Sequence, residues 1–300
     1  MSSLGSLLDL ADLAVARCEG VLSDESREEL ADTVRRARRK RGFIGETLVV
    51  AFAGGTGSGK SSLVNGIVGE SVAPIGVVRP TTDAALAVTP MRSPVNLDRL
   101  LSDLGVTERV ESGALESSVL VDLPDFDSTV EGHRRIVEDV LPRVDAVVWV
   151  FDPEKYSDRT MHDRFLSEFT AYESQFLFVL NHADRLGDLV DVVSEDLARL
   201  LIDDGFAAPE VISTTARAPN VDVSRLVSAL SVRLDTKRTV TTRLVTDLRI
   251  AANRGWADAQ ASMHANADDI SKAERSAISS ATFVSLGVEA ISVLYGLMEG

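Results

Sequence analysis

The sequence predicts a three-layer α/β domain with a mostly parallel sheet, accompanied by an α-helical bundle that both chain ends build. All nine prolines lie between Pro74 and Pro219. An interior proline destabilises a helix by about 3 kcal/mol, so the proline-free flanks favour long helices. In the central part, short apolar runs alternate with helical spacing, which is typical of a sheet covered by helices. We therefore expect helices over 1–46 and 219–300 and the α/β domain over 47–218.

The composition excludes several function classes. The 300 residues carry 31 Lys and Arg against 46 Asp and Glu, a net charge of −15. A dedicated nucleic-acid coat needs a basic face, so nucleic acid is not an expected partner. A single cysteine, Cys18, excludes a disulfide framework and a site with several thiolate ligands. Asp9 and Asp12 stand where a secretory signal would be basic and then apolar, so we expect a cytoplasmic protein.

The N-terminal flank predicts two helices. Ser23 or Asp24 can cap the second helix, which runs to about Arg41. Six of the seven residues from Arg35 to Arg41 are basic. We interpret them as a solvated helix end whose cations suit the C-terminal dipole, and contact with anionic lipid or an acidic partner is the alternative. One apolar stripe at helical spacing predicts the first helix: Leu4, Leu7, Leu8, Ala11, Val15, Cys18 and Leu22.

The C-terminal flank also has helical spacing, from Val223 to Leu234 and again from Val240 to Trp256. The stretch from Ala277 to Met298 has one residue that is charged at neutral pH, Glu289, and is long enough to span a bilayer. Its apolar residues lie on one helical face and its polar residues on another. A helix packed on a protein core is therefore favoured over a membrane helix.

A glycine-rich loop follows the first apolar run of the central part. Residues 47–53, TLVVAFA, predict a strand that leads into GGTGSGKSS and then into a helical segment. This is the pattern GxxxxGK[ST] in a strand–loop–helix context. Glycines let backbone N–H groups surround phosphate oxygens, and the helix presents its positive end to the same anion. The predicted phosphate-binding residues are Gly55, Thr56, Gly57, Ser58, Gly59, Lys60, Ser61 and Ser62.

Two side chains of this loop carry the expected chemistry. Lys60 can reach the β- and γ-phosphates, which makes it a candidate catalytic residue, and the Ser61 hydroxyl can ligand Mg²⁺. ATP and GTP enzymes share this loop, so the base must be decided elsewhere in the chain. No signature like the LSGGQ of ABC-type ATPases is present.

Further apolar runs predict buried strands that end in polar residues. Asp122 ends one run and can hold Mg²⁺ through water beside the phosphate loop. Asp184 follows another and could accept hydrogen bonds from guanine N1–H and its exocyclic amine, a donor pair that adenine lacks. The polar insertion from Arg92 to Glu116 predicts a short helix, Leu97 to Leu104, ended by Gly105. The strand runs are 117–122, 144–151, 175–180 and 211–213.

The order and spacing of these motifs resemble a GTPase of the translation-factor class over about residues 47–218. GGTGSGKSS resembles the first motif of that class, and RPTTDA at 79–84 resembles its switch I threonine motif. DLPD at 122–125 resembles DxxG, NHAD at 181–184 resembles NKxD, and STTA at 213–216 resembles the SAK-type loop. PTTD followed by apolar residues, DLP and the helical flanks look most like the dynamin superfamily, including its bacterial and EH-domain-type branches.

The resemblance implies a role for each matching residue. Thr82, favoured over Thr81, would ligand Mg²⁺ and sense the γ-phosphate, which makes it the second candidate catalytic residue. The metal ligands would then be Ser61, Thr82 and Asp122, the last through water. The remaining nucleotide-binding residues would be Asp125 at the γ-phosphate, Asn181, His182 and Asp184 at the guanosine, and Thr215 or Ala216 at the guanine carbonyl.

Three positions depart from the family pattern, and the phosphate loop contains one bulkier residue. Asp125 stands where the family has glycine, and its carboxylate would repel the γ-phosphate. His182 replaces a lysine that covers the ribose and braces the phosphate loop, and an imidazole reaches less far. Phe126 stands where Ras-like enzymes place a water-orienting glutamine, although dynamin relatives are apolar there too. Thr56 adds bulk beside the γ-phosphate.

The expected function is binding of GTP with Mg²⁺ and slow hydrolysis to GDP, in a nucleotide switch or mechanochemical GTPase. The resemblance further implies a homodimer or heterodimer through the GTPase face, peripheral at the inner face of a membrane. Two alternatives stay open: a nucleotide-binding scaffold without significant hydrolysis, and a P-loop ATPase.

Overall fold

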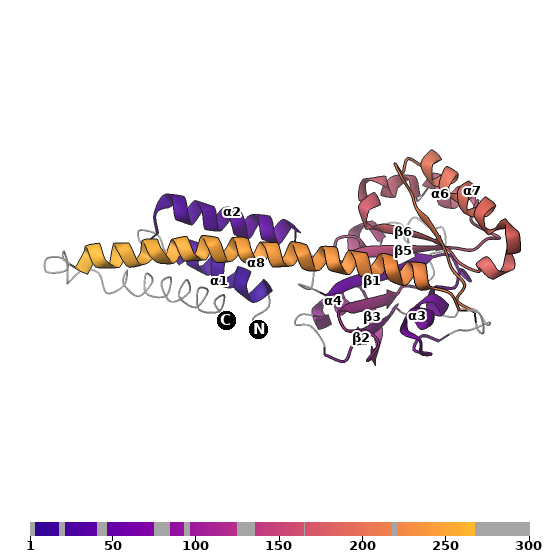
Figure 1. Cartoon of the computed structure of the whole chain (residues 1–300), viewed down its shortest axis with the longest axis horizontal. Coiled ribbons are helices and arrows are strands. Elements are labelled where there is room, and N and C mark those ends of the chain that lie inside the picture. Colours follow the sequence, from indigo (N-terminus) through magenta and orange to yellow (C-terminus); the bar gives the residue numbers. More distant parts are fainter. Residues whose placement is uncertain are drawn as a thin grey trace. The chain divides into compact units, whose positions relative to one another are not determined.

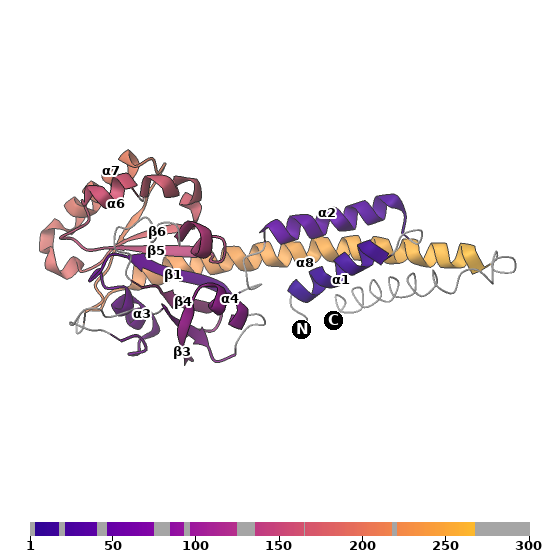
Figure 2. The ribbon, with the colours of Figure 1, turned by 180° about the vertical axis from the view of Figure 1, so that it is seen from behind.

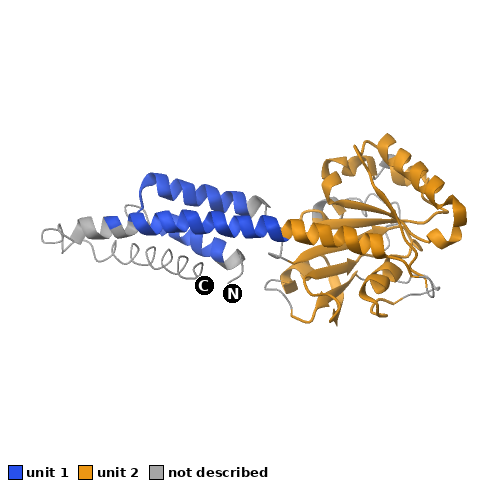
Figure 3. Cartoon of the chain, viewed as in Figure 1, with its two compact units in different colours: residues 1–41, 238–300 blue, residues 42–237 orange. Residues whose placement is uncertain are grey.

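The computed structural model describes residues 4–17, 22–40, 47–74, 85–92, 97–124, 136–164, 166–217 and 221–267. The chain divides into two compact units, residues 1–41 with 238–300 and residues 42–237 (Figure 3). We describe each unit by itself. The helix α8 (Ser224–Ala267) contributes its residues up to Lys237 to one unit and the rest to the other.

A seven-stranded sheet forms the centre of the unit 42–237, in the order β3-β2-β4-β1-β5-β6-β7 (Figure 1). Strands β4, β1, β5, β6 and β7 run parallel, β2 is antiparallel to β4, and β3 is parallel to β2. This confirms the predicted mostly parallel sheet. The strands are β1 (Leu48–Gly54), β2 (Ala85–Pro90), β3 (Val106–Ser112), β4 (Ser118–Asp122), β5 (Ala146–Phe151), β6 (Phe176–Leu180) and β7 (Val211–Ser213).

Helices cover both faces of this sheet (Figures 1 and 2), which gives the predicted three layers. Alternate residues of β1 enter different cores. Val49 and Ala51 pack in the core that includes α4 and α7, whereas Val50 and Phe52 pack in the core that includes α3 and the first part of α8. Central strands buried on both faces read as continuous apolar runs, which is why the sequence revealed them. The helices named here are α3 (Lys60–Val68), α4 (Leu97–Asp103), α6 (Arg159–Arg164) and α7 (Val190–Asp203).

Shorter helical segments complete this unit. One π-helical turn covers Ile136–Val140, and 3-10 segments cover Leu166–Gln175, Ala183–Arg185 and Gly187–Leu189. The first two place Ile136, Val140, Leu166 and Phe169 in the same core as α4 and α7.

The insertion between β2 and β4 contains a strand that the sequence analysis did not predict. The short helix is present as α4, and Gly105 after it has a φ of +68°. The residues that follow form β3, whose mostly exposed side chains lack an apolar pattern. Pairing with β2 creates this edge strand, and Arg109 secures it by donating to Thr89 Oγ1 at 3.1 Å and to Asp98 Oδ1 at 3.0 Å.

Both chain ends contribute to the other unit, and its C-terminal part begins at residue 238 where the sequence analysis expected the boundary after residue 218. Its described helices are α1 (Leu4–Arg17), α2 (Asp24–Lys40) and the later part of α8. Ser23 caps α2, because its Oγ accepts from the Ser26 N–H at 3.2 Å. The apolar core joins all three helices: Leu8, Ala11, Leu30, Val34, Leu248 and Ala252 are fully buried there.

Within the described residues, we find no helix whose length and hydropathy would suit a membrane crossing. The predicted apolar stretch from Ala277 to Met298 lies outside those residues. Part of the basic run is described: Arg35 is exposed and bonds to Asp32, and Arg36 donates to Thr33 Oγ1 at 3.1 Å. These bonds within the helix favour the solvated helix end for those two residues.

A buried ion pair fastens the first part of α8 to the start of β1. Lys237 Nζ donates to Asp145 Oδ2 at 2.5 Å and to the carbonyl of Thr47 at 2.6 Å. Asp145 Oδ2 also accepts from the Val49 N–H at 2.8 Å. Burial lowers the pKa of Lys237, and the charge of Asp145 opposes that shift. The pair therefore keeps a desolvated ammonium next to its compensating carboxylate.

Lys237→Met is expected to lower the free energy of unfolding by about 3 kcal/mol, because it leaves Asp145 desolvated without its cation. Adding Asp145→Asn should recover part of this loss, since the amide carries no charge. Urea denaturation of the three proteins measures both effects. A double variant no more stable than Lys237→Met would contradict the ion-pair explanation.

Candidate nucleotide-binding site

The glycine-rich loop joins β1 to α3 in the middle of the sheet. Since β4 and β5 flank β1, the loop lies at the carboxyl edge where parallel α/β sheets bind ligands. Two glycines are required by space. A Cβ on Gly54 would lie 2.4 Å from the carbonyl oxygen of Val150, and a Cβ on Gly59 would lie 2.2 Å from Nδ2 of Asn181. Gly59 also has a φ of +90° and directly precedes α3. The first turn of that helix therefore faces the space that the loop encloses.

Lys60 is buried and folds back onto its own loop. Its Nζ donates to the carbonyl of Gly54 at 3.0 Å and lies 3.5 Å from that of Gly55. The backbone N–H groups and this ammonium give the loop a positive character that suits phosphate. Among its other predicted members, Ser58 is buried, Gly57 is exposed, and Thr56 and Ser62 are partly buried.

Ser61 and Asp122 meet beside the loop. Ser61 Oγ donates to Asp122 Oδ2 at 2.5 Å, and Asp122 ends β4 opposite Phe52 of β1. Asp122 is only 1% exposed, so its carboxylate is shielded from bulk water. A hydroxyl and a carboxylate are hard oxygen donors of the kind that Mg²⁺ prefers. These residues therefore fit a magnesium ion that also contacts a phosphate. Two other predicted residues, Thr82 and Asp125, lie outside the described residues.

Asn181 connects the loop to two other segments. It is fully buried at the end of β6, its Nδ2 donates to the carbonyl of Ser58 at 2.9 Å, and its Oδ1 accepts from Thr214 Oγ1 at 3.2 Å. The side-chain amide of Asn181 thus links the phosphate loop to the segment after β7. The sequence analysis expected Asn181 to fix the guanine, and in this structure its side chain holds the walls of the site together.

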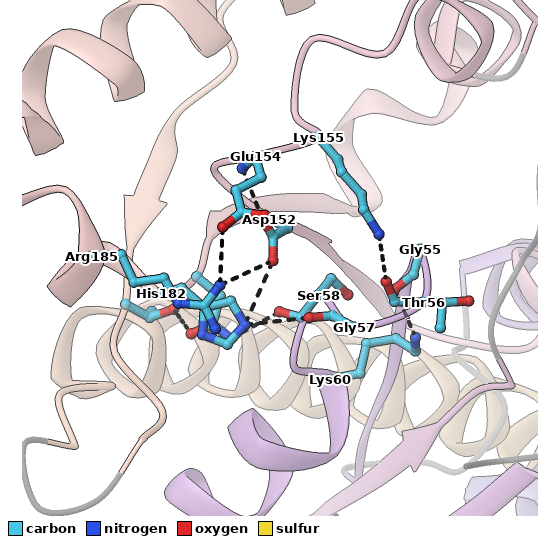
Figure 4. Close-up of polar contacts among 12 residues, drawn as sticks. Gly55, Thr56, Gly57, Ser58, Lys60, Asp152, Glu154, Lys155, His182 and Arg185 are labelled. Atoms are coloured by element: carbon cyan, nitrogen blue, oxygen red, sulfur yellow. Dashed lines mark hydrogen bonds and ion pairs between the residues drawn. The ribbon is translucent and has the colours of Figure 1, made fainter. Parts of the chain in front are cut away.

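His182 contacts the phosphate loop as well (Figure 4). Its Nε2 lies 3.4 Å from the carbonyl of Gly57 and 3.9 Å from Oδ2 of Asp152. Its φ of +59° is the only positive value of a non-glycine residue in the described part of the chain. The imidazole of His182 therefore reaches the phosphate loop. In the GTPases that the motifs resemble, a lysine at this position braces the same loop. The same Asp152 oxygen lies 3.7 Å from Arg185.

Asp184 follows Asn181 closely, on the short turn Ala183–Arg185, and its side chain is exposed. The Ala183 N–H donates to the carbonyl of Thr214 at 3.0 Å, which holds the turn against the segment after β7. Thr215 and Ala216 follow in that segment, each 9% exposed. The predicted base-reading residues therefore come from two adjoining loops.

The sequence analysis did not identify three residues that lie near the site: Asp152, Lys155 and Arg185. Lys155 Nζ lies 3.4 Å from the carbonyl of Thr56, within the phosphate loop. Asp152 directly follows β5 at the same sheet edge as Asp122. The rule that singled out Asp122, a polar residue at the carboxyl end of a central strand, would have found Asp152 too.

The part of the chain that contains the phosphate loop matches a known protein family. Residues 49–182 match the family model described as 50S ribosome-binding GTPase. The match begins in β1 and ends at the second residue of NHAD, so it includes the phosphate loop and Asn181. A comparison with curated protein sequences gives no match.

Several solved structures resemble the chain. Toc33 from Arabidopsis thaliana, in complex with Mg²⁺ and GMPPNP, is 16% identical over 73% of this chain and 97% of its own, with a TM-score of 0.46. A member of an oligomerised bacterial dynamin pair is 13% identical over 94% of this chain and 51% of its own, with a TM-score of 0.49. Era from Aquifex aeolicus is 19% identical over 61% of this chain and 56% of its own, with a TM-score of 0.42.

Proposed function

We propose that the P-loop GTPase domain identified by residues 49–182 binds GTP with Mg²⁺ and hydrolyses it to GDP. GTP or GDP with Mg²⁺ are the ligands of GTPases of this family. The observation that carries the proposal is the hydrogen bond from Asn181 to the carbonyl of Ser58. It joins the NHAD segment directly to the phosphate loop. A carboxylate on that segment, Asp184, can then read the base of the same nucleotide whose phosphates the loop holds.

The residues of the site divide the work of hydrolysis. Lys60 and the N–H groups of the loop bind the β- and γ-phosphates and stabilise the charge that develops as the terminal phosphoryl group is transferred to water. Ser61 and Thr82 would hold Mg²⁺, together with Asp122 through water. The metal, when bound, neutralises phosphate charge. Asp184 orients the guanine, and His182 flanks the guanosine while it supports the loop.

We propose a low basal rate of hydrolysis. By the motif resemblance, Phe126 stands where Ras-like enzymes place a water-orienting glutamine, and the carboxylate of Asp125 would repel the γ-phosphate. A second subunit that meets the nucleotide face, or a bound cation, could supply the missing stabilisation. The proposed assembly is therefore a homodimer or heterodimer through the GTPase face. Turnover per molecule should rise with protein concentration, and phosphate release measured over a concentration series tests this.

The finer proposal is a dynamin-like nucleotide switch or mechanochemical GTPase that works peripherally at a membrane. Its support is the motif resemblance together with a helical unit built from both chain ends. Phosphate release with and without anionic vesicles, combined with vesicle sedimentation, tests the membrane part. Retained GTP binding without turnover under any of these conditions would favour the nucleotide-binding scaffold.

Base selection gives the sharpest test of the GTPase against the ATPase alternative. Asp184→Asn is expected to weaken GTP binding about hundredfold, because an amide cannot accept from both guanine donors. It should strengthen binding of xanthosine triphosphate, whose 2-carbonyl accepts from that amide. Calorimetric titration of each nucleotide in Mg²⁺ buffer measures both changes. Asp188→Asn removes an exposed carboxylate four positions on and serves as the matched control. Equal affinity of the parent protein for GTP and ATP would contradict the proposal.

A further inference from the structure

The chain forms a tight turn directly after β5, and this turn carries Asp152 and Lys155. Oδ1 of Asp152 accepts from the Glu154 N–H at 2.8 Å, and the Asp152 carbonyl accepts from the Lys155 N–H at 2.9 Å. The carbonyl of Lys155 in turn accepts from the Asp158 N–H at 3.1 Å. An aspartate that bonds to its own backbone two residues on is a recognised turn-forming device. The backbone of Lys155 is therefore held in one place.

The two acidic residues of this turn, Asp152 and Glu154, form ion pairs with Arg185. Arg185 NH1 lies 3.7 Å from Asp152 Oδ2 and 3.9 Å from Glu154 Oε1. Among the ion pairs of the described residues, none involves Lys155. Its long side chain is exposed and extends to the phosphate loop, where Nζ lies 3.4 Å from the carbonyl of Thr56 (Figure 4). The ammonium of Lys155 thus contacts a neutral acceptor.

Two ammonium groups therefore meet three successive carbonyls of the loop. Lys60 takes those of Gly54 and Gly55, and Lys155 takes that of Thr56. Figure 4 shows the two lysines approaching this stretch from different segments of the chain. A phosphate oxygen is a stronger acceptor than a peptide carbonyl, since charge-assisted hydrogen bonds are roughly twice as strong as neutral ones. A flexible lysine stem lets the ammonium exchange one acceptor for the other.

We propose that Lys155 is a further nucleotide-contacting residue. When GTP binds, its ammonium gives up the carbonyl of Thr56 and bonds to the terminal phosphate instead. This inference rests on the proposed function, because it assumes a triphosphate in the loop. Thr56 is the residue of the loop expected beside the γ-phosphate. The contact therefore belongs to GTP and is absent with GDP, so Lys155 distinguishes the two nucleotides within a single chain.

Lys155→Ala is expected to weaken binding of the non-hydrolysable analogue GMPPNP about tenfold or more and to change GDP binding less than twofold. Lys155→Arg should keep most of the affinity for GMPPNP, because it keeps the charge. Calorimetry in Mg²⁺ buffer gives both constants, and thermal unfolding without nucleotide should be unchanged. Arg159→Ala, which removes an exposed cation from the start of α6, is the matched control and should bind both nucleotides as the parent does.

Labelling provides a readout that does not depend on activity. With an amine-reactive reagent and mass spectrometry, GMPPNP should protect Lys155 and GDP should not. Equal loss of affinity for both nucleotides, or unchanged affinity for GMPPNP, would overturn the role of Lys155 while leaving the GTPase proposal standing. A parent protein that binds neither nucleotide would overturn the proposed function itself.

Discussion

Lys60→Ala is expected to abolish GTP binding and to leave the fold intact. The ammonium of Lys60 is the loop's own cation, and each charge-assisted hydrogen bond to a phosphate contributes about 1.5–3 kcal/mol. Losing such bonds to the β- and γ-phosphates weakens binding by at least about hundredfold. The substitution also removes the hydrogen bond from Nζ to the carbonyl of buried Gly54, at a cost to stability of about 1–3 kcal/mol, which a domain of ordinary stability tolerates.

Calorimetric titration with GTP and circular dichroism on heating separate the two parts of this prediction. Arg225→Ala is a suitable control, because it removes one exposed positive charge from the same unit. GTP binding by Lys60→Ala with the parent affinity would show that the nucleotide site lies elsewhere.

Gly59→Ala is expected to damage both stability and nucleotide binding. The added Cβ would lie 2.2 Å from Nδ2 of Asn181, and the backbone has a φ of +90°. Either Asn181 leaves the carbonyl of Ser58 or the loop shifts, and both outcomes separate the phosphate loop from the NHAD segment. We expect a loss of about 3 kcal/mol in the free energy of unfolding and at least about a hundredfold weaker GTP affinity.

The same helix provides the matched control. Gly69 ends α3 with a φ of +77°, and a Cβ there would meet no atom within 4 Å. Gly69→Ala therefore imposes the backbone strain alone, about 1–2 kcal/mol, without the collision. Urea denaturation and GTP titration of both variants isolate the contribution of the Asn181 contact. Equal effects of the two substitutions would mean that this contact does not organise the site.

Features with a local cause could be predicted from the sequence. The strands β1, β5 and β6 are apolar throughout, and β4 is apolar between its two end residues, because helices cover both faces of the sheet. Ser23 marks a helix start because its hydroxyl can accept from the first turn. The phosphate loop is recognisable because its glycines, its lysine and its serine occur at the short fixed spacing GxxxxGK[ST].

Features that depend on distant parts of the chain could not be predicted. The strand β3 has a polar sequence and forms through its pairing with β2. The side-chain amide of Asn181 donates to the carbonyl of Ser58, 123 positions away, and Lys155 reaches a carbonyl 99 positions away.

By itself, then, the sequence determined the fold class, the phosphate loop and the polar residues at the strand ends, since periodicity and loop chemistry are short-range properties. Only the tertiary structure decided which of those residues meet, because hydrogen bonds between loops depend on the order and register in which the strands assemble.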